Sequence, residues 1–145
     1  MTTRAGDPTW SAREIEHTAD VGFEVEAPTW ESLLERSALV VAAEIVALEG
    51  VRADEAVRIE IAAGDREELL HDWLQAVLVR VQTGFVPCEV AVGAASDTQV
   101  VATLRGEALD PGRHHVHGEV KGVTWHGLAV EEIPGRLRAR VILDV

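Results

Sequence analysis

Hydrophobic and polar positions alternate regularly near both ends of this sequence. Residues 21–26 alternate between large apolar and small or acidic side chains, a period of two that predicts a half-buried strand. By the same parity Asp20 lies on the polar face, where this strand begins. Residues 136–145 repeat the pattern and leave Asp144 on the polar face. The pattern therefore predicts two strands, far apart in the sequence, that each carry an aspartate on the polar side.

Two stretches show the three- and four-residue spacing of amphipathic helices. The first covers residues 30–46 and follows Thr29, a residue type that caps helix N-termini. The second follows Asp65, which with Glu68 forms a capping-box-like start, and it runs to about position 83. Each helix has one broad apolar face, so both need a sheet to cover.

Strand-like patterns dominate the rest of the sequence. They cover residues 56–61, 85–92, 99–109, 120–131 and 136–145, with Pro134-Gly135 as a tight turn before the last strand. This order of elements predicts an α+β fold, a mixed or antiparallel sheet with two amphipathic helices packed on it. Residues 1–12 are polar and are expected to form a flexible N-terminal segment. Residues 13–145 are expected to form a single domain, which is the usual organisation at this length.

The composition indicates a soluble, cytoplasmic protein. Apolar residues make up 47% of the 145 positions, and no apolar run approaches the roughly 20 residues that a membrane helix requires. The start of the chain lacks the apolar core of a signal peptide, and Cys88, the only cysteine, cannot form an internal disulfide. Cys88 is predicted to be a small core residue. We therefore expect a reducing compartment and no membrane contact.

The charge balance restricts the partners of this chain. Thirteen Lys and Arg residues against 25 Asp and Glu residues give a net charge of −12. Gripping a phosphate backbone needs clustered cations, so strong nucleic-acid binding by this chain alone is not expected. The same field attracts metal cations and basic protein surfaces.

Asp20 and Asp144 are the first candidates for chemistry. Terminal strands often pair, and if these two strands did so, both carboxylates would face the same side of the sheet. The carboxylate of Val145 would then lie beside Asp144, and three oxygen anions so placed would repel one another without a cation. Oxygen ligands of this kind select calcium, magnesium or manganese over zinc. The alternative is that both aspartates are simply solvated.

The histidines and one lysine give weaker signals. His114, His115 and His117 crowd one loop, but the sequence offers no cysteine pair or helical His-x-x-x-His to join them in a zinc site. We predict that these loop histidines are solvated. Lys121 could hold a phosphate or a partner's carboxylate, and it fits equally well as an exposed lysine at a strand edge.

His17 and His126 could shuttle protons or orient the acidic site, although each fits better as a hydrogen-bonded histidine near the sheet. Gly127 interrupts the strand pattern, as a bulge or a close backbone approach would. The sequence lacks a Gly-rich phosphate loop, a Gly-x-Ser-x-Gly elbow, Cys-x-x-Cys and His-Glu-x-x-His. An autonomous enzyme would therefore have to use Asp, His, Lys and a metal.

Four separated motifs resemble those of the archease family, in the family's order and across almost the whole chain. They are residues 16–22 (Glu-His-Thr-Ala-Asp-Val-Gly), 68–74 (Glu-Leu-Leu-His-Asp-Trp-Leu), 120–128 (Val-Lys-Gly-Val-Thr-Trp-His-Gly-Leu) and 139–145 (Ala-Arg-Val-Ile-Leu-Asp-Val). The combination is far more specific than any one motif. The chain departs from the family pattern at Gly122, Trp125 and Leu143, where Ala, Tyr and Phe are usual.

The resemblance implies an accessory protein rather than an enzyme. Its partner would be the RNA-splicing ligase that joins RNA ends in tRNA splicing and RNA repair, and it would promote attachment of GMP to the ligase and repeated turnover. The resemblance also implies a divalent metal, calcium in the family, with magnesium or manganese as alternatives. It maps the metal ligands to Asp20, Asp144 and the main-chain oxygen of Val145, and a further activating residue to Lys121.

Two other classes of function remain open from the residues. A stand-alone metal-dependent phosphoesterase would use the same carboxylates with His17 or His126 as the base. A chaperone-like interaction module would bind clients through an apolar surface, and the aspartates would then be incidental.

Overall fold

The computed structural model describes residues 2–5, 12–15 and 20–145. Its elements are β1 (Thr2–Arg4), β2 (Ala12–Ile15), β3 (Asp20–Ala27), α1 (Trp30–Ala43), β4 (Glu55–Ala62), α2 (Arg66–Gln82), β5 (Phe85–Ala95), β6 (Gln99–Ala108), β7 (Gly122–Val123), β8 (Ala129–Ile133) and β9 (Arg136–Asp144). The predicted α+β class and both predicted helices are confirmed. Among these described residues, neither helix has the length and apolar character needed to cross a bilayer.

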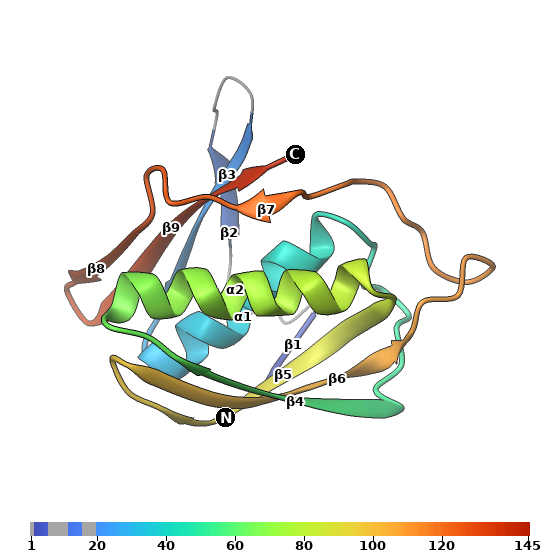
Figure 1. Ribbon diagram of the computed structural model, residues 1–145, viewed down its shortest axis with the longest axis horizontal. Coiled ribbons are helices and arrows are strands. Elements are labelled where there is room, and N and C mark those ends of the chain that lie inside the picture. The colour runs from blue at the N-terminus through green and yellow to red at the C-terminus, as the bar shows by residue number, and fades with distance from the viewer. Residues whose placement is uncertain (1, 6–11, 16–19) are drawn as a thin grey trace.

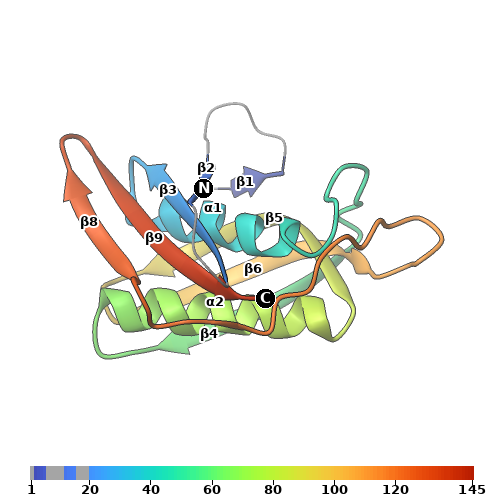
Figure 2. The ribbon, with the colours of Figure 1, turned by 90° about the horizontal axis from the view of Figure 1, so that it is seen from above.

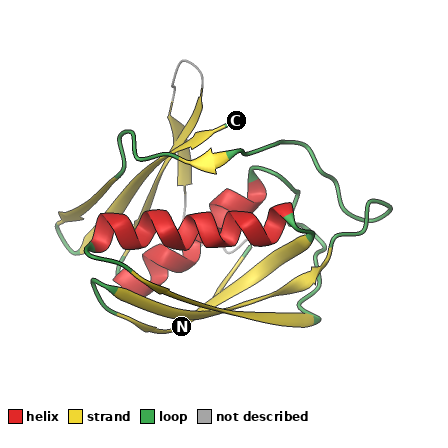
Figure 3. Cartoon of the chain, in the orientation of Figure 1, coloured by secondary structure: helices red, strands yellow, loops and turns green. Residues whose placement is uncertain are grey.

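The strands form two antiparallel sheets instead of the single sheet that was predicted. One sheet has the order β1-β5-β6-β4, and the other has the order β2-β3-β9-β7, with β8 also paired to β9. The two helices lie between the sheets and contact strands of both (Figures 1 and 3). The view from above shows β8, β9 and β3 next to one another (Figure 2). Alternation along a strand reveals its buried face but not its neighbour, which explains this difference.

Local capping fixes where the helices begin. Thr29 and Ser32 form a reciprocal capping box at the start of α1. The Asp65 carboxylate accepts a hydrogen bond from the main-chain N–H of Glu68 at the start of α2 (2.8 Å). The buried indole of Trp73 then donates to the main-chain oxygen of Leu34 (2.9 Å) and ties the two helices together.

The predicted strand over residues 120–131 is divided into β7 and β8. Gly127 lies between them with φ +67°, a conformation that L side chains rarely adopt. A Cβ at this position would lie 2.9 Å from Cδ1 of Ile142 on β9. Gly127 thus lies in the turn between the two strands, four positions after β7 ends, and packs closely against the side chain of Ile142.

Part of the N-terminal region is described by the structure. Residues 2–4 form β1, which pairs with β5, and the Thr3 side chain is buried. Residues 6–11, which belong to the same predicted segment, lie outside the described residues. Cys88 on β5 is buried as predicted, and this burial raises the pKa of its thiol.

Candidate functional site

The two strands that carry Asp20 and Asp144 lie side by side. β3 pairs antiparallel with β9 over the whole length of β3, and Asp20 is directly opposite Asp144. Directly opposed residues in an antiparallel pair project to the same face of the sheet. The predicted pairing of the strands that carry Asp20 and Asp144 is therefore confirmed, and their aspartates share one face.

Hydrophobic burial and cross-strand charge pairs explain this pairing. Phe23 and Val25 on β3 and Val141 on β9 are buried on the inner face. On the outer face Glu24 lies opposite Arg140 in the strand register. The hydrogen bond from Arg13 is the largest cause of the lowered pKa of Glu24, although its partial burial acts in the opposite direction. The opposed charges and the buried inner face both favour the register that aligns the aspartates.

Strand β7 brings Lys121 to the same end of the sheet. Gly122 pairs with Asp144, and the main-chain N–H of Lys121 donates to the main-chain oxygen of Asp144 (2.7 Å). Asp20 is half-buried, whereas Lys121, Asp144 and Val145 are exposed. We call this group of four residues the acidic strand end.

The donors of the acidic strand end are oxygen atoms. Two carboxylates and the main-chain oxygen of Val145 suit calcium, magnesium or manganese better than a metal that prefers nitrogen or sulfur. Within the described part of the chain, no three His, Cys, Asp or Glu side chains converge to form a metal cluster. Calcium takes about six to eight oxygen ligands, so water or partner groups would have to complete the coordination. The residues fit an open cation site better than a closed one.

The two candidate supporting histidines are placed differently. His126 is exposed in the loop between β7 and β8. It is not among the residues that the strand pairing aligns, which are Asp20, Asp144 and Gly122. His17 lies outside the described residues. The supporting role of both side chains stays a prediction.

The loop histidines separate into buried and exposed members. His114 is 8% exposed, and its Nδ1 accepts a hydrogen bond from the main-chain N–H of Asp110 (2.8 Å). Its Nε2 lies 3.4 Å from a carboxylate oxygen of Glu107. His115 and His117 are exposed, with ring centroids 5.9 Å apart. The prediction of solvated loop histidines is therefore wrong for His114, which supports the loop structurally.

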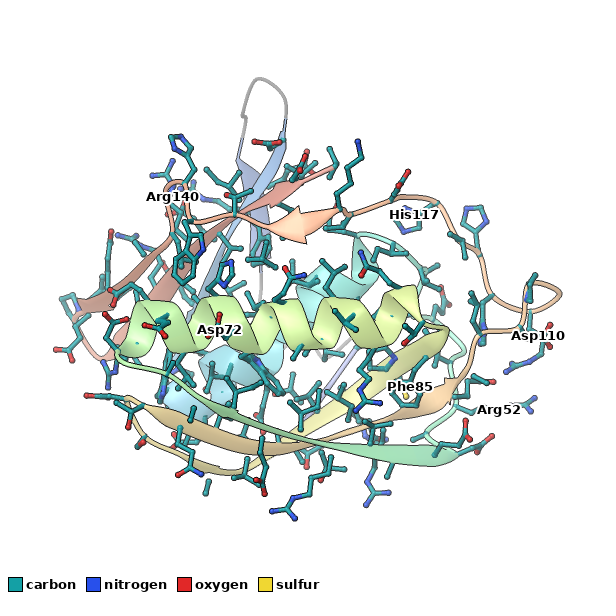
Figure 4. All side chains as sticks on the ribbon, viewed as in Figure 1. Arg52, Asp72, Phe85, Asp110, His117 and Arg140 are labelled. Carbon is teal, nitrogen blue, oxygen red and sulfur yellow. The ribbon has the colours of Figure 1, made fainter. Side chains whose placement is uncertain are left out.

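A second side-chain cluster, which sequence reasoning missed, lies where α2 meets the loop after β7. The ring of His71 stacks on that of Trp125 with a centroid distance of 3.8 Å and an interplanar angle of 12°. His71 Nδ1 lies 2.9 Å from Oδ1 of Asp72, and its Nε2 lies 2.8 Å from the main-chain oxygen of Val123. Figure 4 shows Asp72 on α2 and Arg140 near the adjoining loop. Both rings belong to motifs that the sequence analysis identified. Their contact joins residues far apart in sequence, so the motifs alone did not predict it.

These features define a small α+β protein in which β3 and β9 pair and present an acidic edge. A family model described as "Archease protein family (MTH1598/TM1083)" matches residues 13–145. The chain belongs to the archease family.

Individual relatives agree with this assignment. The protein archease of Methanopyrus kandleri is 41% identical over 136 residues, which cover 91% of this chain and 97% of the relative. The protein archease of Methanothermobacter thermautotrophicus is 34% identical and covers 88% and 94%, respectively.

Two solved structures share the fold. The solution structure of protein 1598 from Methanobacterium thermoautotrophicum has a TM-score of 0.78 and 32% identity, and it covers 92% of this chain and 98% of that chain. The crystal structure of a Thermotoga maritima protein, described as "an archease, possible chaperone", has a TM-score of 0.63 and 21% identity over 92% and 96% of the chains.

Proposed function

We propose that this chain activates an RNA-splicing ligase by promoting its guanylylation and its repeated turnover in tRNA splicing and RNA repair. The observation that carries the proposal is the register that sets Asp20 opposite Asp144 and brings Lys121 beside them. Membership in the archease family and a net charge of −12, suited to a basic enzyme surface, support it further. The ligase supplies the catalytic groups, and this chain is the accessory protein.

The residues of the acidic strand end would divide the work between them. Asp20, Asp144 and the main-chain oxygen of Val145 would hold a divalent cation, with calcium preferred over magnesium and manganese. Such a cation would supply positive charge that polarises a phosphoryl group. Lys121 would bind a phosphate oxygen or a ligase carboxylate through its ammonium group. Because Asp144 and Lys121 are exposed, both can reach a partner's surface.

Ligase guanylylation tests these roles. Catalytic amounts of the chain are added to the ligase of the same organism with radiolabelled GTP, and the labelled ligase is counted together with the joined RNA. Asp20→Asn, Asp144→Asn and Lys121→Met should each abolish stimulation while the melting temperature stays within a few degrees of wild type. Asp54→Asn is the matched control, since it removes an exposed carboxylate elsewhere. Normal stimulation by all three site variants would refute the site assignment.

Calcium binding has an independent readout in thermal unfolding. A ligand at 100 times its Kd stabilises the folded state by about 2.7 kcal/mol. For a domain of this size that corresponds to a rise in melting temperature of about 5 to 11 °C. Asp20→Asn and Asp144→Asn should remove the rise. An equal rise in both variants would place the cation elsewhere.

A chaperone-like function is the second candidate. The Thermotoga maritima protein with this fold is described as a possible chaperone. The 57% exposed side chain of Trp125 offers an apolar contact for a client. Suppression of client aggregation that survives Asp20→Asn, without any effect on the ligase, would favour this function. Phosphoester hydrolysis by the purified chain with manganese would instead indicate the hydrolase class.

A further inference from the structure

Trp125 is unusual among the tryptophans that the structure describes. Its side chain is 57% exposed, whereas Trp30 is 6% exposed and Trp73 is completely buried. An exposed indole contributes little to the stability of the free protein, because most of its apolar surface stays in water. Exposed tryptophans that are held rigidly are instead typical of the residues that dominate protein–protein binding energy.

The ring of Trp125 is held in place from beneath. His71 stacks against one face at 3.8 Å between centroids, and the hydrogen-bonding positions of this imidazole, at Asp72 and at the main-chain oxygen of Val123, fix its orientation. The main-chain N–H of Leu128 donates to the main-chain oxygen of Trp125 (3.4 Å), which closes the turn around it. One face of the indole is therefore covered and the other is presented to solvent. Such preorganisation lowers the entropic cost of binding.

Trp125 follows the acidic strand end along one edge of the molecule. It lies three positions after Gly122, the residue paired with Asp144, so the chain can separate the two features by no more than about 10 Å. A partner of ordinary interface size would cover both. Trp125 is therefore placed to contact the same partner as the acidic strand end.

The charges favour a cationic group on the open face of Trp125. The side chain of Asp72, 40% exposed, lies against the underlying imidazole, and the whole chain carries a net charge of −12. Arg140 on β9 lies near this loop, and its positive charge would act against a cationic group. It faces Glu24 across the strand pair, however, and contributes to the lowered pKa of that carboxyl. A phosphate-bearing nucleotide would meet an unfavourable overall field, whereas a guanidinium would meet a favourable one.

We propose that the open face of Trp125 is the anchor on which an arginine side chain of the partner protein stacks. Indole is the strongest cation–π partner among side chains, and the planar guanidinium stacks on it face to face. The inference rests on the proposed function for the identity of the partner, the RNA-splicing ligase. It adds a docking contact that is separate from the activating groups at the acidic strand end.

Direct binding to the ligase, measured by titration calorimetry, tests this contact. Trp125→Ala should raise the Kd at least tenfold, and Trp125→Phe should raise it less because a π face remains. Trp125→Leu keeps a large apolar side chain without a π face, so it should resemble Trp125→Ala. Asp54→Asn, which removes an exposed carboxylate elsewhere, should bind like wild type. Val79→Ala is the matched control, since Val79 is a 45% exposed apolar residue on α2.

Each alternative result has a defined meaning. An unchanged Kd for Trp125→Ala, with normal binding by wild type, overturns the docking contact and leaves the proposed function standing. Equal affinities of the Leu and Phe variants overturn the guanidinium as the occupant. Absence of ligase binding by wild type overturns the proposed function and this inference with it. Saturable quenching of tryptophan fluorescence by GMP, lost in Trp125→Phe, would assign the platform to a nucleobase and also overturn the inference.

Discussion

Glu35 provides a sharp test of how the first described strand is attached to the rest of the fold. This residue of α1 is completely buried, and its two carboxylate oxygens accept hydrogen bonds from different strands. Thr3 Oγ1 on β1 donates to one oxygen (3.0 Å), and the main-chain N–H of Val92 on β5 donates to the other (2.9 Å). Burial raises the pKa of Glu35, although both hydrogen bonds act in the opposite direction.

Replacing Thr3 by valine keeps the shape of the side chain but removes the donor. One buried oxygen of Glu35 then loses its partner, which costs about 1 to 3 kcal/mol. For a domain of this size, such a loss lowers the melting temperature by about 2 to 12 °C. Glu35→Gln keeps a polar group that can still pair with Thr3 and Val92, and it removes the buried charge. Thr3→Val should therefore cost less when it is combined with Glu35→Gln than in the wild-type background.

The pH dependence of stability follows from the raised pKa of Glu35. The folded state holds this proton more tightly than the unfolded state, so the stability gained from it is complete below the ordinary value of 4.5. That stability is lost as the pH rises through the higher, folded-state pKa. As the pH rises from the ordinary pKa to the folded-state pKa, the free energy of unfolding of wild type should therefore fall relative to that of Glu35→Gln. Above the folded-state pKa, the difference between the two proteins should stay constant.

Urea unfolding followed by circular dichroism, at several pH values from 4 to 8, measures these differences in the free energy of unfolding. A matched control is Glu31→Gln, which removes a less buried carboxylate from the same helix. A free-energy difference between wild type and Glu35→Gln that does not change with pH would refute the reasoning. The reasoning would also be refuted if Thr3→Val cost as much in the Glu35→Gln background as in the wild-type background.

Three other substitutions test the backbone and the loop. Gly127→Ala should cost about 1 to 3 kcal/mol in urea unfolding, because φ is positive there and Ile142 must move aside. Gly106→Ala should cost about 3 kcal/mol or more and lower the yield of folded protein, since its Cβ would clash with the main-chain oxygen of Val86. His114→Ala should cost about 1 to 3 kcal/mol by leaving a main-chain N–H of its loop without a partner, with faster amide exchange there as the local readout. A loss below 0.5 kcal/mol for any of the three would contradict the corresponding contact.

The elements that the sequence predicted well are those set by local physics. Both helices follow from their apolar spacing and from caps at Thr29 and Asp65, which the structure confirms. The strands that carry Asp20 and Asp144 follow from strict alternation, and so does the parity that puts each aspartate on the polar face of its own strand. These features depend on neighbours within a few positions, and a single sequence contains that information.

The features that were missed depend on distant contacts. β1 is short and polar, and nothing near Thr3 indicates that it pairs with β5 or that Glu35 will bury an oxygen against it. The division into two sheets has the same origin, because alternation leaves the pairing partner open. The stack of His71 on Trp125 joins a helix to a loop that lies far along the chain. Only the folded arrangement brings such groups together.

The pairing of β3 with β9 also determines when the acidic strand end can exist during folding. Its two carboxylates come from strands separated by almost the whole length of the chain, and only the long-range pairing aligns them. Contacts of such high sequence separation form late, because much of the chain must already be ordered. A partly folded chain would retain helices but no aligned carboxylates. The cation affinity proposed for the acidic strand end would thus be a property of the completed fold and not of its partly folded precursors.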